Sequence, residues 1–224
     1  MQDFAIYDMD RTVTRTGTYT PFLLHAAWTL SPWRLVLAPL VPLAMAAYAL
    51  KLIDRRRLKE ICQRLLIGAR IPRARLAPAT ERFADMVMRT NIHPGALRQI
   101  AADRAAGRRL VLATASYRFY VEPIAARLGF DDVIATGSVL GLDDIVHARI
   151  DGENNYGPAK LRLIEAWFRA QGIDRAAAHV TFYSDHVSDA PVLDWADEAV
   201  AANPGGPLRR LAARRGWRVV DWGF

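Results

Sequence analysis

The sequence has 224 residues and a mass of 25.0 kDa, enough for one compact domain or one domain with an inserted module. With 52% hydrophobic and 24% charged residues, its composition is that of a folded protein and excludes a disordered chain. The single cysteine, Cys62, excludes a disulfide framework and a multi-cysteine metal site, and we expect it in the core. The net charge of +7 favours acidic partners: phosphate esters, nucleic acid or an anionic membrane.

The first apolar run, Phe4–Tyr7, predicts a strand that leads directly into two aspartates. It is too short for the apolar region of a signal peptide, so we expect a cytoplasmic protein. Further on, short apolar runs alternate with helical patterns, which is typical of a parallel sheet with helices on both faces. Strands are expected at 110–113, 132–136, 179–183, 199–203 and 217–220, a hairpin over 137–151, and helices at 121–128 and 158–171.

The interval from Thr16 to about Gly95 has helical patterns and no clear strand. It separates the first strand from the rest of the predicted sheet. We therefore expect an all-helical cap over residues 16–95, inserted into a core formed by residues 1–15 and 96–224. The predicted fold is a three-layer α/β/α core with a central parallel sheet.

Within this interval, Leu35–Leu50 is an uncharged run of 16 residues, interrupted by Pro39 and Pro42. A membrane-spanning helix needs about 20 residues. The run is flanked by Trp33 and by basic residues that reach Arg57 and Lys59. Three interpretations follow: a buried cap helix, a segment lying in the interface of an anionic membrane through Trp33–Arg57, or a transmembrane span. The second would place the protein at the inner face of the membrane.

Two carboxylates, Asp8 and Asp10, follow the first strand. Parallel sheets bind ligands at this carboxyl edge. One carboxylate can attack phosphorus, while the other protonates the leaving oxygen and later activates water. The alternative is a turn with two solvated acids.

Two further residues have types that suit a phosphate group. Thr114 follows a strand and precedes a helix, where a hydroxyl and free N–H groups can bind a phosphate oxygen; the alternative is a helix cap, for which Ser116 is better placed. Lys160 opens a helix, where a fixed ammonium could neutralise phosphoryl charge; the alternative is a solvated lysine.

A third pair of groups, Asp185 and Asp189, follows another strand at a spacing of four. Their oxygens suit Mg²⁺, whereas no second His or Cys nearby has the spacing of a zinc site. The alternative is a helix cap and a solvated acid.

In order and placement, these residues resemble the haloacid dehalogenase superfamily, in its phosphoserine phosphatase-like branch with a helical cap (subfamily IB, cap type C1). Asp8-Met-Asp10-Arg-Thr12 matches the first motif, Thr114 the second, Lys160 the third and Asp185 with Asp189 the fourth. Position 11 is Arg where many members have Gly, a residue that there serves the backbone geometry.

The resemblance implies a Mg²⁺-dependent phosphomonoester hydrolase. Asp8 would be the nucleophile that becomes an aspartyl-phosphate, and Asp10 the general acid and base, with its carbonyl on the metal. Thr114 would hold a phosphoryl oxygen and Lys160 would stabilise the phosphoryl charge. Asp185 would bind Mg²⁺ directly, with Asp189 supporting the metal site.

Three features that are less specific than the catalytic motifs resemble the phosphatidylglycerophosphatase C-type group of lipid phosphatases. They are Pro21–Leu24, the apolar run with Asp54–Leu58, and Tyr120–Ala125. This favours a lipid phosphate as substrate. A small soluble metabolite such as phosphoserine is the alternative. A non-catalytic basic protein that binds membrane or nucleic acid is another, although no nucleic-acid-binding motif is present and we expect no nucleic-acid partner.

Overall fold

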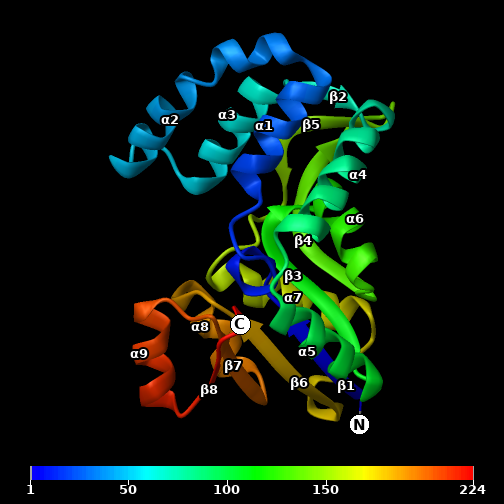
Figure 1. Ribbon diagram of the computed structural model, residues 1–224, viewed down its shortest axis with the longest axis vertical. Coiled ribbons are helices and arrows are strands. Elements are labelled where there is room, and N and C mark those ends of the chain that lie inside the picture. Colours follow the sequence, from blue (N-terminus) through cyan, green and yellow to red (C-terminus); the bar gives the residue numbers. More distant parts are fainter. Residues whose placement is uncertain (1, 224) are drawn as a thin grey trace.

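Eight strands form one sheet in the computed structural model, which describes residues 2–223 (Figure 1). Residues 1 and 224, which the expected core boundaries include, lie outside the described residues. The strands are β1 (Gln2–Tyr7), β2 (Arg70–Pro72), β3 (Arg109–Tyr117), β4 (Asp132–Leu140), β5 (Ile145–Asp151), β6 (Ala178–Ser184), β7 (Glu198–Ala202) and β8 (Arg218–Val220). Their order is β2-β5-β4-β3-β1-β6-β7-β8, and the six strands from β4 to β8 along this order are parallel.

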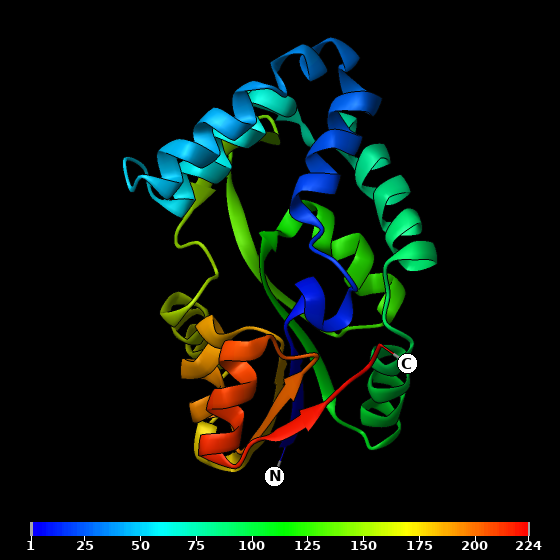
Figure 2. The same ribbon diagram turned by 60° about the vertical axis from the view of Figure 1, so that its left-hand side comes forward.

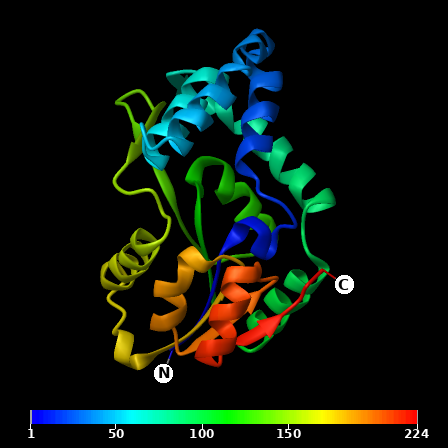
Figure 3. The same ribbon diagram turned by 90° about the vertical axis from the view of Figure 1, so that its left-hand side faces the viewer.

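Helices cover both faces of the sheet and extend beyond its upper end (Figures 1 and 3). They are α1 (Tyr19–Leu30), α2 (Leu40–Ala49), α3 (Arg55–Leu66), α4 (Arg73–Thr90), α5 (Pro94–Ala105), α6 (Arg118–Leu128), α7 (Pro158–Ala170), α8 (Ala190–Trp195) and α9 (Gly206–Arg215). The expected three-layer α/β/α arrangement is confirmed.

Alternating side chains of the central strand fill two separate cores. Phe4 and Ile6 pack with apolar residues of α7, α8 and α9 on one face. Ala5 and Tyr7 point to the other face, which α5 and α6 cover. This two-residue period, with both faces buried, is why the buried part of the strand, Phe4–Tyr7, is a continuous apolar run. The expected strands and hairpin of the C-terminal half are confirmed, and Gly129 ends α6 with a φ of 75°.

The chain leaves the core for the cap and returns by two segments that lie side by side. Thr14 forms an isolated bridge with Ile92, and the Arg15 amide donates to the Asn91 carbonyl at 2.8 Å. Helices α1 to α3 gather at one end of the molecule, where α2 lies along α3 (Figure 2). Cys62 is buried in α3, as expected.

The same interval contains one short strand that the sequence did not predict. β2 pairs antiparallel with β5, and its Ile71 is buried. Three residues are too few for a two-residue period to stand out in a sequence. The core sheet therefore continues into the cap.

The apolar run Leu35–Leu50 is divided between a 3₁₀ turn, Pro32–Leu37, and α2, with Pro39 at the break. Of the three interpretations of this run, the buried cap helix is wrong. Val36 is 79% exposed, Leu43 66% and Met45 56%, and Ala44 is the one buried residue of α2. A helix that is apolar on all sides and packs mainly on one neighbour must leave apolar surface uncovered. None of the helices in residues 2–223 has the length and apolarity to cross a bilayer, so the interpretation of this run as a transmembrane helix is wrong as well.

Candidate active site

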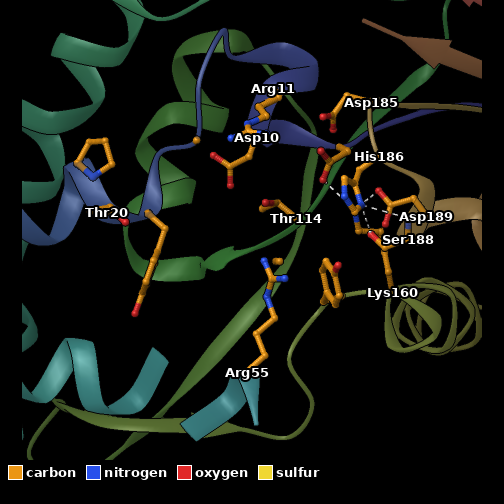
Figure 4. Close-up of a pocket in the computed structure, with 16 residues that line it drawn as sticks. Asp10, Arg11, Thr20, Arg55, Thr114, Lys160, Asp185, His186, Ser188 and Asp189 are labelled. Atoms are coloured by element: carbon orange, nitrogen blue, oxygen red, sulfur yellow. Dashed lines mark hydrogen bonds and ion pairs between the residues drawn. The ribbon is translucent and has the colours of Figure 1, made fainter. Parts of the chain in front are cut away.

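A cavity of about 500 Å³ lies where the strands end and the cap begins (Figure 4). β1 lies between β3 and β6, with Tyr7 opposite Leu112 and Tyr183, so the loops that follow these strands meet. The structure brings all six candidate residues of the sequence to the lining of this cavity: Asp8, Asp10, Thr114, Lys160, Asp185 and Asp189.

Lys160 is the buried centre of an ionic cluster, with an exposed fraction of 2%. Its ammonium donates to Asp8 Oδ1 at 2.7 Å and to Asp189 Oδ2 at 2.6 Å. Burial lowers its pKa, but the charges of Asp189 and Asp8 outweigh this effect and leave the pKa raised. A solvated lysine in the first turn of α7 is therefore excluded.

Asp8 combines burial with a cationic neighbour. Burial raises the pKa of its carboxyl to about 7, against the opposing effect of Lys160. Asp189 and Asp185 raise it further, because they add negative charge nearby. A carboxylate with these neighbours gains from any additional cation in the cavity.

Asp10 is held by three donors. The Thr18 amide and hydroxyl donate to Oδ1 at 2.6 and 2.8 Å, and the Ser116 hydroxyl donates to Oδ2 at 2.7 Å. Ser116 is therefore no helix cap; Tyr117 occupies the cap position of α6 without a side-chain bond. Asp10 is fixed between the start of the cap and the Thr114 loop.

Thr12 links two acids that come from different strands. Its hydroxyl lies 3.1 Å from Asp8 Oδ2 and 3.2 Å from Asp185 Oδ1, and it accepts from the Asp185 amide at 2.9 Å. One hydroxyl proton cannot satisfy two carboxylates at once. Burial raises the pKa of Asp185 to about 6, and no Lys or Arg of residues 2–223 pairs with it.

The oxygens of Asp8, Asp10 and Asp185 fit Mg²⁺. This cation prefers hard oxygen ligands, and the buried Asp185 carboxylate has no Lys or Arg partner among the described residues to neutralise it. Residues 2–223 contain no group of three or more His, Cys, Asp or Glu side chains arranged to hold a metal. Mg²⁺ commonly uses one or two carboxylates and completes its shell with water and a substrate phosphate. Asp189 accepts from Lys160 and from the Ser184 hydroxyl through its Oδ2 atom.

Arg11 adopts a left-handed backbone, with φ of 66° and ψ of −6°. Gly has no Cβ and reaches this region without strain, whereas Arg does not. The turn Met9–Val13 still closes: the Thr14 amide bonds to the Met9 carbonyl at 2.9 Å. The turn therefore tolerates Arg at a position whose geometry suits Gly.

Several lining residues were not predicted as site residues from the sequence. Tyr19 and Arg55 come from the cap, and His186 and Ser188 lie between the two aspartates of the fourth segment. Thr12 was visible in the D-x-D-x-T pattern, but its link to Asp185 depends on the order of the strands. The cap residues had no local signal, because cap packing brings them to the site.

A family model for haloacid dehalogenase-like hydrolases matches residues 5–194. Phosphoserine phosphatase SerB1 of Mycobacterium tuberculosis is 30% identical over 149 residues, which cover 66% of this chain and 47% of that protein. The inhibition of morphological differentiation protein of Streptomyces azureus is 34% identical over 131 residues, 58% of this chain and 46% of that protein. The chain thus spans about half the length of these curated relatives. Histidinol-phosphatase of Neisseria meningitidis serogroup C is 24% identical, covering 69% of this chain and 70% of that enzyme.

Solved structures agree in fold. A protein of unknown function from Bordetella pertussis Tohama I covers 99% of both chains with a TM-score of 0.89 and 26% identity. A phospho-aspartyl intermediate analogue of phosphoserine phosphatase covers 100% of this chain and 94% of its own, with a TM-score of 0.61 and 15% identity, which shows a shared fold. The fold, the order of the motifs and the matched family model together establish that the chain belongs to the haloacid dehalogenase-like hydrolase family.

Proposed function

We propose that this protein hydrolyses phosphomonoesters through a covalent aspartyl-phosphate on Asp8. The observation that carries the proposal is the buried Lys160, bonded to Asp8 and Asp189 beside a cavity that Thr114 and Asp185 also line. A buried ammonium beside a carboxylate is an arrangement for stabilising a phosphoryl group during transfer. A non-catalytic binding protein would have no use for this costly cluster of buried charges.

The reaction has two steps. An Asp8 carboxylate oxygen attacks phosphorus, the bond from phosphorus to the ester oxygen breaks, and Asp10 gives a proton to the departing alcohol. Water then attacks phosphorus, Asp10 takes a proton from it, and the bond from phosphorus to the Asp8 oxygen breaks, which releases inorganic phosphate and restores the Asp8 carboxylate. Lys160 and Thr114 hold the phosphoryl oxygens throughout. Mg²⁺ bound near Asp8, Asp185 and the Asp10 carbonyl would supply charge neutralisation between the two anions.

The test is phosphate release from p-nitrophenyl phosphate by the purified chain with Mg²⁺. Asp8→Asn should abolish release while the circular dichroism spectrum is unchanged, because Asn keeps the shape and cannot act as the nucleophile. Full activity of Asp8→Asn would contradict the assignment of Asp8. Matched activity of an Asp151→Asn variant, an exposed acid outside the cavity, would exclude a general effect of charge.

Two substrate classes remain candidates. The names of the relatives, phosphoserine phosphatase and histidinol-phosphatase, favour a small soluble phosphate ester. The exposed apolar surface of the 3₁₀ turn and α2, next to Arg34 and Lys51, favours a lipid phosphate reached by peripheral contact with an anionic membrane. Phosphate release from phosphatidylglycerophosphate in mixed micelles, compared with phosphoserine, distinguishes these classes.

A further inference from the structure

A second cavity, of about 380 Å³, adjoins the first. The two share Asp10, Tyr19, Arg55 and Ala115 in their linings. The second one continues between α2 and α3, and Asp8 does not line it. Asp10, which protonates the departing oxygen in the proposed reaction, lines both cavities, so the alcohol part of the substrate can extend into the second one.

Two basic side chains of α3 face this space. Arg55 and Lys59 are four residues apart, so they lie on the same side of the helix. Figure 4 shows Arg55 pointing into the pocket from the side opposite Asp10 and Asp185. Its guanidinium lies 3.9 Å from the centre of the Tyr156 ring. Lys59 is buried, and its ammonium donates to the Ala115 carbonyl at 2.6 Å and to Asn154 Oδ1 at 2.8 Å.

Neither cation has an acidic partner. Among the residues that the structure describes, no carboxylate forms an ion pair with Arg55 or Lys59. Burial, together with the charge of Arg55, lowers the pKa of Lys59 to about 7, against the opposing effect of the Asp10 carboxylate. A buried ammonium without an ion-pair partner gains from an anion that binds beside it.

The acids of the cap are all directed elsewhere. Asp54 caps α3 by accepting from the Arg57 amide at 2.7 Å, and Glu60 accepts from the Ile150 amide at 3.0 Å. Glu81 and Asp85 both pair with a single partner, Arg127 of α6, at 2.9 and 2.8 Å. No acidic side chain of the cap lines either cavity, so the cap offers no carboxylate to a substrate ammonium.

We propose that Arg55 and Lys59 form an anion subsite for the leaving group, so that the preferred substrates are phosphomonoesters whose alcohol carries a second anionic group and no ammonium. The inference rests on the proposed function and specifies its substrate class. Met45, Tyr48 and Leu58 make the remainder of the second cavity largely apolar. The second anion can therefore belong to a small soluble ester or to a lipid headgroup.

The test uses two matched pairs of esters with the full chain and Mg²⁺. The soluble pair is 3-phosphoglycerate and glycerol 3-phosphate, which differ by a carboxylate. The lipid pair is phosphatidylglycerophosphate and phosphatidic acid in the same mixed micelles, which differ by a phosphodiester. We expect kcat/KM to be about tenfold or more higher for the anionic member of at least one pair, because a charge-assisted contact has about that value. The pair that shows the preference identifies the source of the anion.

Variants test whether α3 causes the preference. Arg55→Gln and Lys59→Met should each lower the ratio of the two kcat/KM values about tenfold. Arg64→Gln, which removes an exposed charge of the same helix outside both cavities, should leave the ratio unchanged. Arg55 is exposed, so its variant remains informative if Lys59→Met does not fold.

The outcomes separate the two proposals. Turnover of p-nitrophenyl phosphate with no preference in either pair contradicts the anion subsite alone. A preference that neither Arg55→Gln nor Lys59→Met reduces also contradicts it. Absence of turnover with every ester contradicts the proposed function, and the subsite with it. A better rate with phosphoserine than with 3-phosphoglycerate contradicts the exclusion of an ammonium.

Discussion

Lys160 Nζ lies 2.7 Å from Asp8 Oδ1, although 152 positions separate the two residues in the sequence. The same ammonium bonds to Asp189, so one buried cation compensates two buried acids. This relationship makes Lys160 important for stability as well as for the proposed chemistry.

Replacement of Lys160 by Met should abolish phosphate release and lower the free energy of unfolding by about 3–5 kcal/mol, because Asp8 and Asp189 lose their buried partner. Urea unfolding monitored by circular dichroism measures the second effect. Lys51→Met removes an exposed lysine and is the control. Equal unfolding midpoints for the wild type and the Lys160 variant would show that the cluster does not stabilise the fold.

Thr12→Val removes the hydroxyl that links Asp8 and Asp185 while keeping the side-chain shape. We expect the Mg²⁺ concentration for half-maximal phosphate release to rise about 10–100-fold, because outer hydrogen bonds orient metal-binding carboxylates. Thr16→Val, which removes a hydroxyl bonded to Asn91 instead, should leave it unchanged. An unaltered Mg²⁺ dependence in Thr12→Val would contradict the role of Thr12.

Arg11→Gly should stabilise the protein by up to about 1 kcal/mol. The left-handed backbone costs an L-residue about 1–2 kcal/mol, and the greater freedom of Gly in the unfolded chain offsets part of the gain. Arg64→Gly, within α3, should instead destabilise by about 1 kcal/mol, since Gly is unfavourable inside a helix. Chemical unfolding of both variants checks the opposite signs, and a loss of stability in Arg11→Gly would contradict the prediction.

Lys59 should make stability depend on pH. The charged and titratable groups around its ammonium are Arg55, Asp10, Tyr19 and Tyr117. Burial lowers its pKa from 10.5 to about 7 in the folded state. Between these values the unfolded chain binds more protons than the folded one, so this contribution to stability rises with pH.

The measurement is urea unfolding at pH 7, 8, 9 and 10 for the wild type and Lys59→Met. The difference in unfolding free energy, wild type minus variant, should increase with pH by at most about 1.4 kcal/mol per pH unit. Below pH 7 the difference should be constant. A difference that stays constant up to pH 10 would mean that the lysine titrates normally in the folded protein.

The exposed apolar surface of α2 predicts binding to vesicles that contain anionic lipid. Leu43→Gln should reduce co-sedimentation with phosphatidylglycerol-containing vesicles several-fold, because a 66% exposed side chain contributes directly to such contact. Leu97→Gln, at a 43% exposed leucine of α5 far from α2 in sequence, is the control. Absence of binding by the wild type would remove the support that α2 gives to a lipid substrate.

The strands of the core could be predicted from the sequence, because their apolar patterns match their buried positions in the sheet. Buried strands such as β1 and β6 have continuous apolar runs, and the polar residues that follow them necessarily meet at one edge of a parallel sheet. The contacts of Asp8, Lys160 and Asp189 follow from this topology together with the spacing of the motifs.

The cap was less predictable. Its contacts depend on how separate segments pack on one another, and the hydrophobic pattern within each segment does not show this. The apolar run over α2 gave the same signal as a core helix, and only the arrangement of α3 showed that one side alone is covered. Lys59 resembled an ordinary basic residue in a basic stretch. Its burial against Ala115 and Asn154 arises from the position of α3 above the core.

The pairing of β2 with β5 has a mechanical consequence. The cap is fastened to the core at several places, and three of them are the paired segments around Thr14 and Ile92, the β2–β5 ladder, and the contact of α4 with α6 through Arg127. A rigid swing of the whole cap would break all three attachments together. We therefore expect access to the cavities to change through α2, whose Met45 and Tyr48 line the second cavity, rather than through a movement of the whole cap.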